Sequence, residues 1–127
     1  MNKCYRDLIV WQKAMDLVVG CYQLTSEFPK NEVYGLASQL QRAAVSIPSN
    51  IAEGNERGSD KECFYHLRVA TGSLAELETQ IELAFRLGYS SPETRDKLLS
   101  NCAEVGRMLH GLRNRLKVKI DEAKNAS

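Results

Sequence analysis

The chain has 127 residues, the size of one ordinary domain, and a chain of this length needs neither a metal ion nor a disulfide to fold. Its 17 Lys and Arg residues nearly balance its 16 Asp and Glu residues, and this net charge of +1 predicts neither a nucleic-acid binder nor a membrane binder. No apolar run approaches the roughly 20 residues of a membrane span, and the N-terminus lacks the apolar segment of a signal peptide. We therefore expect a cytoplasmic protein without membrane contact.

The spacing of the apolar residues predicts an all-α protein with four helices. The expected helices cover about residues 8–27, 60–87 and 91–119, and the second of the four begins between Asn31 and Gly35 and continues to about Glu56. Asp7 is the expected N-cap of the first helix, and Ser59 with Glu62 forms a predicted capping box at the third. The fourth helix is expected to begin with Ser91 as its N-cap and Pro92 at its first position.

The second predicted helix carries too little charge for a helix with one face in solvent. From Gly35 to Ala52 the only formal charge is Arg42, so both faces are expected to meet protein, either inside a bundle or at a subunit interface. Pro48 lies in the interior of this helix, where proline costs about 3 kcal/mol and usually causes a kink. We expect a bent helix, and the alternative is two shorter helices. The residues from Gly54 to Gly58 are expected to form a loop.

Four helices joined by short turns favour an antiparallel up-down-up-down bundle. The predicted domain covers residues 1–120, and residues 121–127 form a polar C-terminal tail. Small residues cluster in the middle of the second and third helices and would let the helix axes approach closely. We expect two such groups to pack together: Ala43, Ala44 and Ser46 on one helix, and Ala70, Thr71, Gly72, Ser73 and Ala75 on the other.

No group of residues points to catalysis. Cys63 and His66 lie three residues apart, with Cys102 on the facing helix, so a Cys/His metal site is one interpretation. Helical-wheel geometry places Cys63 and His66 in the apolar stripe, which favours buried core residues instead. The Glu-x-x-His pattern of di-iron bundles does not occur in the sequence, nor does a CxxC pair. We expect a protein that is not an enzyme and that holds no metal or cofactor.

The strongest charge feature is the end of the fourth helix. Five cations and no acid occur between residues 107 and 119: Arg107, Arg113, Arg115, Lys117 and Lys119. They are candidates for contacts to the phosphates of RNA or DNA. The alternative, favoured for a single copy, is a solvated helix end whose cations suit the negative end of the helix dipole. In a ring of copies this basic patch would repeat, and multivalency would strengthen a weak site.

A further set of residues are candidates for structural or interface contacts: Arg42, Ser46, Pro48, Asn50, Glu53, Glu76 and Glu78. Because Arg42 is the lone charge between Gly35 and Ala52, we expect it to pair with Glu76 or Glu78. Replacing Arg42 by Ala, or Asn50 by Leu, is expected to disturb stability or assembly before any binding activity.

Three segments of the chain carry a family resemblance: YRDLIVWQKAMDLV at 5–18, FPKNEVYGLASQLQRAAVSIPSNIAEGNERGS at 28–59, and HLRVATGSLAELETQIELAFRLGY at 66–89. Their most specific parts are Arg-Ala-Ala-x-Ser-Ile-x-x-Asn-Ile-Ala-Glu-Gly at 42–54 and Gly-Ser-Leu-x-Glu-x-Glu-Thr at 72–79. Over about residues 5–116 the chain resembles the 23S rRNA intervening-sequence protein family, also called the four helix bundle protein or S23 family.

This resemblance implies a four-helix bundle that assembles into a homopentameric ring, in a family often encoded within intervening sequences of rRNA genes. A distant resemblance is to the accessory variability determinant of diversity-generating retroelements, a strongly basic pentamer that binds nucleic acid and a reverse transcriptase. The first hypothesis is a non-enzymatic, oligomeric scaffold or binding module. The alternative is a nucleic-acid-binding accessory protein with a reverse transcriptase or ribosomal partner, which uses the basic end of the fourth helix together with Arg57 and Lys61.

Overall fold

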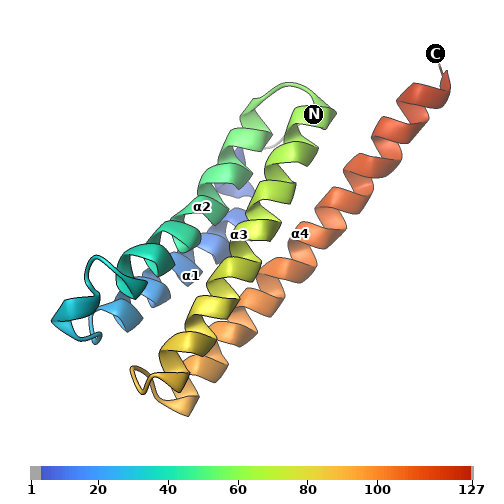
Figure 1. Cartoon of the computed structure of the whole chain (residues 1–127). Helices are drawn as coiled ribbons and strands as arrows, with labels where there is room; N and C mark the ends of the chain where they lie inside the picture. Colours follow the sequence, from blue (N-terminus) through green and yellow to red (C-terminus); the bar gives the residue numbers. More distant parts are fainter. Residues whose placement is uncertain (1–3, 127) are drawn as a thin grey trace.

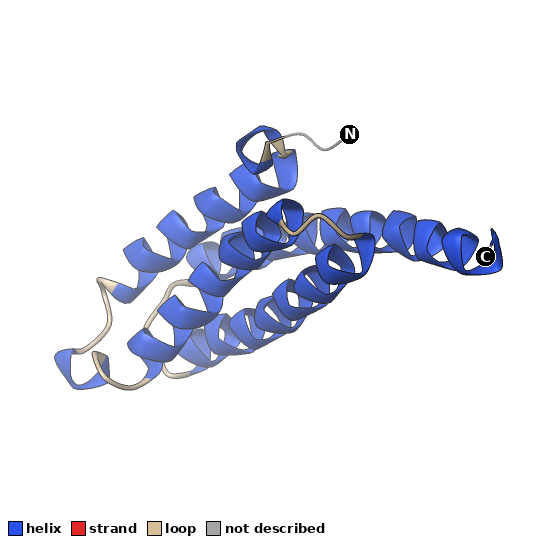
Figure 2. Cartoon of the chain, turned by 90° about the horizontal axis from the view of Figure 1, so that it is seen from above, coloured by secondary structure: helices blue, strands red, loops and turns tan. Residues whose placement is uncertain are grey.

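The protein is an all-α, antiparallel bundle of four long helices (Figures 1 and 2). A computed structural model describes residues 4–126. The helices are α1 (Ile9–Thr25), α2 (Leu36–Glu56), α3 (Asp60–Arg86) and α4 (Pro92–Ala126), with short 3-10 turns at η1 (Tyr5–Asp7) and η2 (Lys30–Glu32). The predicted fold class is confirmed. Within residues 4–126, none of the helices combines the length and the apolar character that a membrane crossing requires.

The core runs along the axis of the bundle and draws apolar side chains from all four helices. These side chains recur every three or four residues, so each helix turns one stripe inward. α1 packs on α2 and α4, and α3 packs on α2 and α4, so α1 and α3 lie diagonally opposite each other. The largest fully buried side chains are Leu17, Cys21, Leu40, Ile47, Ile51, Leu77, Ile81, Cys102, Val105 and Leu109.

Hydroxyl groups cap the starts of α3 and α4 as predicted. The Ser59 hydroxyl oxygen accepts a 3.1 Å hydrogen bond from the Glu62 N–H, and the hydroxyl also donates to the Glu62 carboxylate at 3.1 Å. The Ser91 hydroxyl oxygen accepts from the Thr94 N–H at 3.1 Å, and Pro92 is the first residue of α4. The free N–H groups of each first turn are therefore partly satisfied by a local side chain.

The predicted cap of α1 is wrong. Asp7 belongs to η1, and Leu8 takes the N-cap position with extended backbone and no side-chain hydrogen bond. The predicted loop after α2 begins too early, because α2 continues to Glu56. Gly54 is buried inside this last turn, where a Cβ atom would lie only 2.8 Å from the Cβ of His66. The glycine marks a close approach between α2 and α3 instead of a turn.

α2 is one uninterrupted helix with Pro48 buried in its interior, so the alternative of two shorter helices is wrong. Pro48 cannot donate to the carbonyl of Ala44. The side-chain amide of Asn50 donates to a different carbonyl, that of Ser46 one turn earlier, at 2.8 Å. The bend at Pro48 stays a prediction.

α4 continues well beyond the expected end at Lys119 and extends past the rest of the bundle (Figure 2). Residues 121–126, expected in the polar tail, are exposed but helical. They include no glycine or proline, and Lys117 forms an ion pair with Asp121 one turn later, at 3.4 Å. The polarity of this segment was therefore no sign of a helix end.

The predicted packing of small residues between α2 and α3 is partly confirmed. Ala43, Ala44 and Ala70 are buried, and the Ser46 and Ser73 hydroxyl groups lie 2.8 Å apart. Two members of the expected group, Gly72 and Ala75, are exposed instead. They lie on the outer side of α3, about half a turn from the buried stripe.

Candidate functional site

A chain of polar side chains crosses the contact between α2 and α3. The Asn50 amide nitrogen donates to the Ser46 carbonyl and lies 3.1 Å from the Ser46 hydroxyl, which in turn meets the Ser73 hydroxyl. The Asn50 carbonyl oxygen lies 2.9 Å from Nδ1 of His66. Because this oxygen can only accept, Nδ1 of His66 carries the proton. One continuous hydrogen-bonded polar set therefore consists of Ser46, Asn50, His66 and Ser73.

Side-chain hydrogen bonds of this polar set join α2 to α3. The nearest thiol, Cys63, has its pKa raised by burial and by the nearby Asp60 carboxylate, which disfavours a reactive thiolate. Within residues 4–126, no three His, Cys, Asp or Glu side chains are grouped so that they could hold a metal ion. Cys102 is fully buried in the core, and His66 is committed to Asn50.

A shallow hollow of about 400 Å³ lies beside this set, at the connection between α2 and α3, lined by Arg57, Lys61, Glu62, Tyr65 and His66. Arg57 was a candidate for phosphate contact. It donates to the Glu53 carboxylate at 2.7 Å and lies 3.9 Å from the Glu62 carboxylate. The hydrogen bond from Arg57 is the main cause that lowers the pKa of Glu53. Two carboxylates thus compensate this cation, which makes the hollow a poor phosphate site.

The basic residues at the end of α4 divide into two groups. Arg113 is half-buried, with Nη1 at 3.5 Å from the Thr71 hydroxyl and its guanidinium 5.8 Å from the centre of the Phe64 ring. Lys117 is paired with Asp121. The other three are exposed and form no ion pair with any residue between 4 and 126: Arg107, Arg115 and Lys119.

Helical geometry places these three free cations within one third of the circumference of α4, since successive residues turn by about 100°. Arg113 and Lys117 point to the other side. The sequence made all five cations candidates for phosphate contacts, whereas the unpaired and exposed ones in the structure are Arg107, Arg115 and Lys119. Arg115 and Lys119 follow Arg107 by 8 and 12 residues, and this spacing in the sequence already indicated a shared side of the helix.

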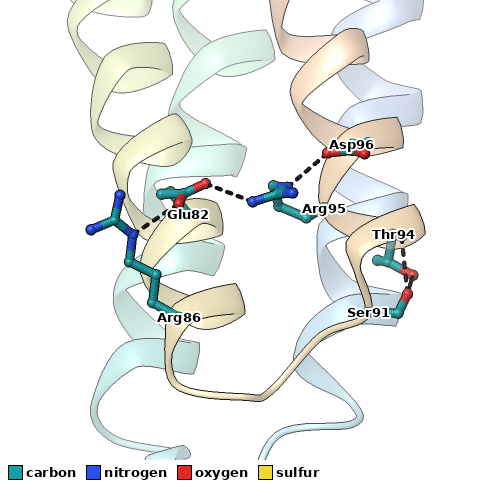
Figure 3. Close-up of polar contacts among 6 residues, drawn as sticks. All are labelled: Glu82, Arg86, Ser91, Thr94, Arg95 and Asp96. Atoms are coloured by element: carbon teal, nitrogen blue, oxygen red, sulfur yellow. Dashed lines mark hydrogen bonds and ion pairs between the residues drawn. The ribbon is translucent and has the colours of Figure 1, made fainter.

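A second polar cluster, which the sequence analysis missed, joins α3 to α4 (Figure 3). Arg95 donates to Glu82 at 3.3 Å and to Asp96 at 2.7 Å, and its guanidinium lies 3.9 Å from the centre of the Phe85 ring. Arg86 donates to Glu82 at 2.9 Å, and this bond is the main cause that lowers the pKa of Glu82. The spacing of Glu82 and Arg86 by four residues was visible in the sequence, but the contact across to Arg95 was not.

The expected ion pair of Arg42 with Glu76 or Glu78 is wrong. Arg42 and Glu76 are exposed and Glu78 is half-buried, and none of the three forms an ion pair with another described residue. Arg42 points out of α2 toward solvent instead of across the contact with α3. Of the other structural candidates, Ser46 and Asn50 belong to the polar set, Pro48 is buried, and Glu53 pairs with Arg57.

These features define the class of the protein: an all-α four-helix bundle with polar side-chain contacts between its helices. The chain belongs to the 23S rRNA-intervening sequence protein family, whose model matches residues 6–111. A similar solved structure is a protein of unknown function from the S23 ribosomal protein family of Bacteroides thetaiotaomicron. It shares 21% identity with a TM-score of 0.75, covering 83% of this chain and 98% of its own. No match was found among curated proteins.

Proposed function

We propose that this protein is a non-enzymatic helical binding module that acts through self-association, as a homopentameric ring. The observation that carries this proposal is an exposed apolar stripe along α1. Met15, Val19 and Tyr22 recur at spacings of four and three residues, and they are 40%, 55% and 46% exposed. Contiguous exposed apolar surface of this kind is typical of protein–protein contact. The number five comes from the family resemblance.

Sedimentation velocity and native mass spectrometry of the purified chain test this proposal over a concentration series. The expected mass is five times the 14.3 kDa of one chain. A monomer at a concentration of about 100 μM would overturn self-association, since a useful assembly is expected to form well below that concentration. A different closed oligomer would overturn only the pentamer.

A second candidate function is nucleic-acid binding through α4. It is supported by the free cations Arg107, Arg115 and Lys119, which share one side of a helix that projects beyond the bundle. Such cations gain binding free energy by releasing counterions from the phosphate backbone. Repetition around a ring would raise the avidity of this small patch.

Fluorescence anisotropy with a labelled RNA hairpin and a DNA duplex, at several salt concentrations, tests the second candidate. The triple variant with Ala at 107, 115 and 119 is expected to bind more weakly and with a shallower salt dependence. The matched control removes three exposed cations elsewhere: Lys30, Arg68 and Lys97. Equal losses in both variants, or no binding at about 50 mM salt, would rule out a specific α4 surface.

A further inference from the structure

The exposed apolar stripe of α1 continues onto α2. Thr25 on α1 accepts a 3.0 Å hydrogen bond from the Gln41 side chain on α2, which fixes the register of these antiparallel helices. Tyr22 lies one turn before Thr25 and Val45 one turn after Gln41, so both occupy the same level. Val45 is 40% exposed. We define the α1–α2 face by Met15, Val19, Tyr22, Arg42 and Val45.

This face carries a single charge. Lys13, in the middle of α1, turns toward α4 and pairs with Glu104 at 3.4 Å. Asp16 lines the groove between α1 and α4, and Val19 lies at the border between this groove and the α1–α2 face. Arg42 remains, exposed and without an ion pair among the described residues. Any partner that covers the α1–α2 face must supply a carboxylate, since a buried cation without a counter-ion is strongly unfavourable.

A face-to-face pair of identical copies does not meet this need. In such a two-fold contact the same patch serves both partners, so the two Arg42 side chains would enter an apolar contact with no acid on the face. The partner surface is therefore a different one. On a second copy it must combine exposed apolar side chains with an unpaired carboxylate.

The groove between α3 and α4 has this combination. It has a volume of about 640 Å³, and Leu83, 44% exposed, and the half-buried Leu99 line it together with Glu78. The neighbouring acid Glu82 is already bonded to two arginines (Figure 3), whereas Glu78 forms no ion pair with a described residue. The groove thus holds one available carboxylate beside apolar side chains.

We infer that the α1–α2 face of one copy docks on the α3–α4 groove of a second copy, with Arg42 paired to Glu78. The order of the helices puts these two surfaces on opposite sides of the bundle. The contact is therefore head-to-tail, and each copy uses its α1–α2 face on one neighbour and its α3–α4 groove on another. Head-to-tail contacts form a ring where the rotation at each step closes, and an open filament where it does not. This inference rests on the proposed self-association and names its two surfaces.

Charge reversal tests the pairing, with sedimentation velocity as the readout and circular dichroism as the check of folding. R42E and E78R are each expected to raise the dissociation constant at least about 30-fold, because each leaves two like charges in the contact. The double variant R42E/E78R restores opposite charges and is expected to recover assembly. The control K97E makes the same charge change at an exposed residue beside the groove between α1 and α4, outside both surfaces, and leaves assembly unchanged.

The outcomes separate the inference from the proposal on which it rests. A monomeric wild type refutes self-association itself. An oligomeric wild type that tolerates R42E, or a double variant that stays dissociated, refutes this interface alone. Loss of assembly in E76R but not in E78R assigns the contact to the outer side of α3 and also refutes it. Should a reversal unfold the chain, R42Q and E78Q remove only the charge and must each weaken assembly.

Discussion

Tyr89 donates a 2.8 Å hydrogen bond from its phenolic hydroxyl to the carboxylate of Glu32, which joins the connection after α3 to the one before α2. The second carboxylate oxygen of Glu32 accepts from the N–H of Leu36, the first residue of α2, at 3.1 Å. The Tyr89 ring also contacts Phe28, with ring centres 5.2 Å apart. One carboxylate therefore caps a helix and fastens this end of the bundle.

Replacing Tyr89 by Phe is expected to lower the melting temperature at pH 7 by a few degrees. The bond from Tyr89 is the largest cause that holds the pKa of Glu32 below its ordinary value. A carboxyl with a lowered folded pKa contributes stability above its unfolded pKa, near 4.3, and loses it as the pH falls through the folded pKa. The deficit of Tyr89→Phe should therefore shrink as the pH is lowered from about 5 to 3.

Thermal melts over this pH range measure the effect, and Tyr34→Phe is the control because Tyr34 is 97% exposed. A deficit that stays constant with pH would show that Tyr89 acts through its ring contact and not through the carboxylate.

Gly54→Ala is expected to destabilise the bundle by about 1–3 kcal/mol. The new Cβ would lie 2.8 Å from the His66 Cβ and 3.3 Å from the Cys63 carbonyl oxygen, both on a packed helix. Gly72→Ala is the matched control, since no atom lies within 4 Å of its new Cβ, and it should stabilise α3 by up to about 1 kcal/mol. Urea unfolding of both variants checks the opposite signs; two stabilising substitutions would contradict the close approach.

Asn50→Leu is expected to cost about 1–3 kcal/mol, because it leaves Nδ1 of His66 without its partner inside the α2–α3 contact and leaves the Ser46 hydroxyl with Ser73 alone. Gln39→Leu, at an exposed position of the same helix, should change the unfolding free energy by less than about 0.5 kcal/mol. Chemical denaturation compares the two. Equal effects would show that the polar set adds nothing to stability.

The four cysteines are expected to react with a thiol reagent in a fixed order. Cys4 is exposed and should be modified first, while Cys63 is half-buried and should follow slowly. Burial raises the pKa of Cys21 and of Cys102 to about 12, so their reactive thiolate forms are negligible at neutral pH. Counting modified thiols before and after unfolding checks the order. Early modification of Cys102 would show that the core opens locally.

Much of the fold followed from patterns that are local in the chain. The helices, the caps at Ser59 and Ser91, and the inward stripes depend on residues within one or two turns of each other, and periodicity reports such relationships directly. The errors also came from local signals. Gly54 suggested a turn and the polar residues after Lys119 suggested a helix end, but a distant contact sets the first and helix propensity the second.

The candidate site depended on how the helices rotate and slide against each other, which periodicity does not specify. Arg113 lay among five cations in the sequence, yet its contact with Thr71 removes it from the basic surface. Arg42 is the only formal charge between Gly35 and Ala52, and the sequence alone shows this. Among residues 4–126, neither Arg42 nor Glu78 has an ion-pair partner, and Glu78 lies in the groove between α3 and α4. Both facts required the packed helices, because they depend on neighbours far away in the chain.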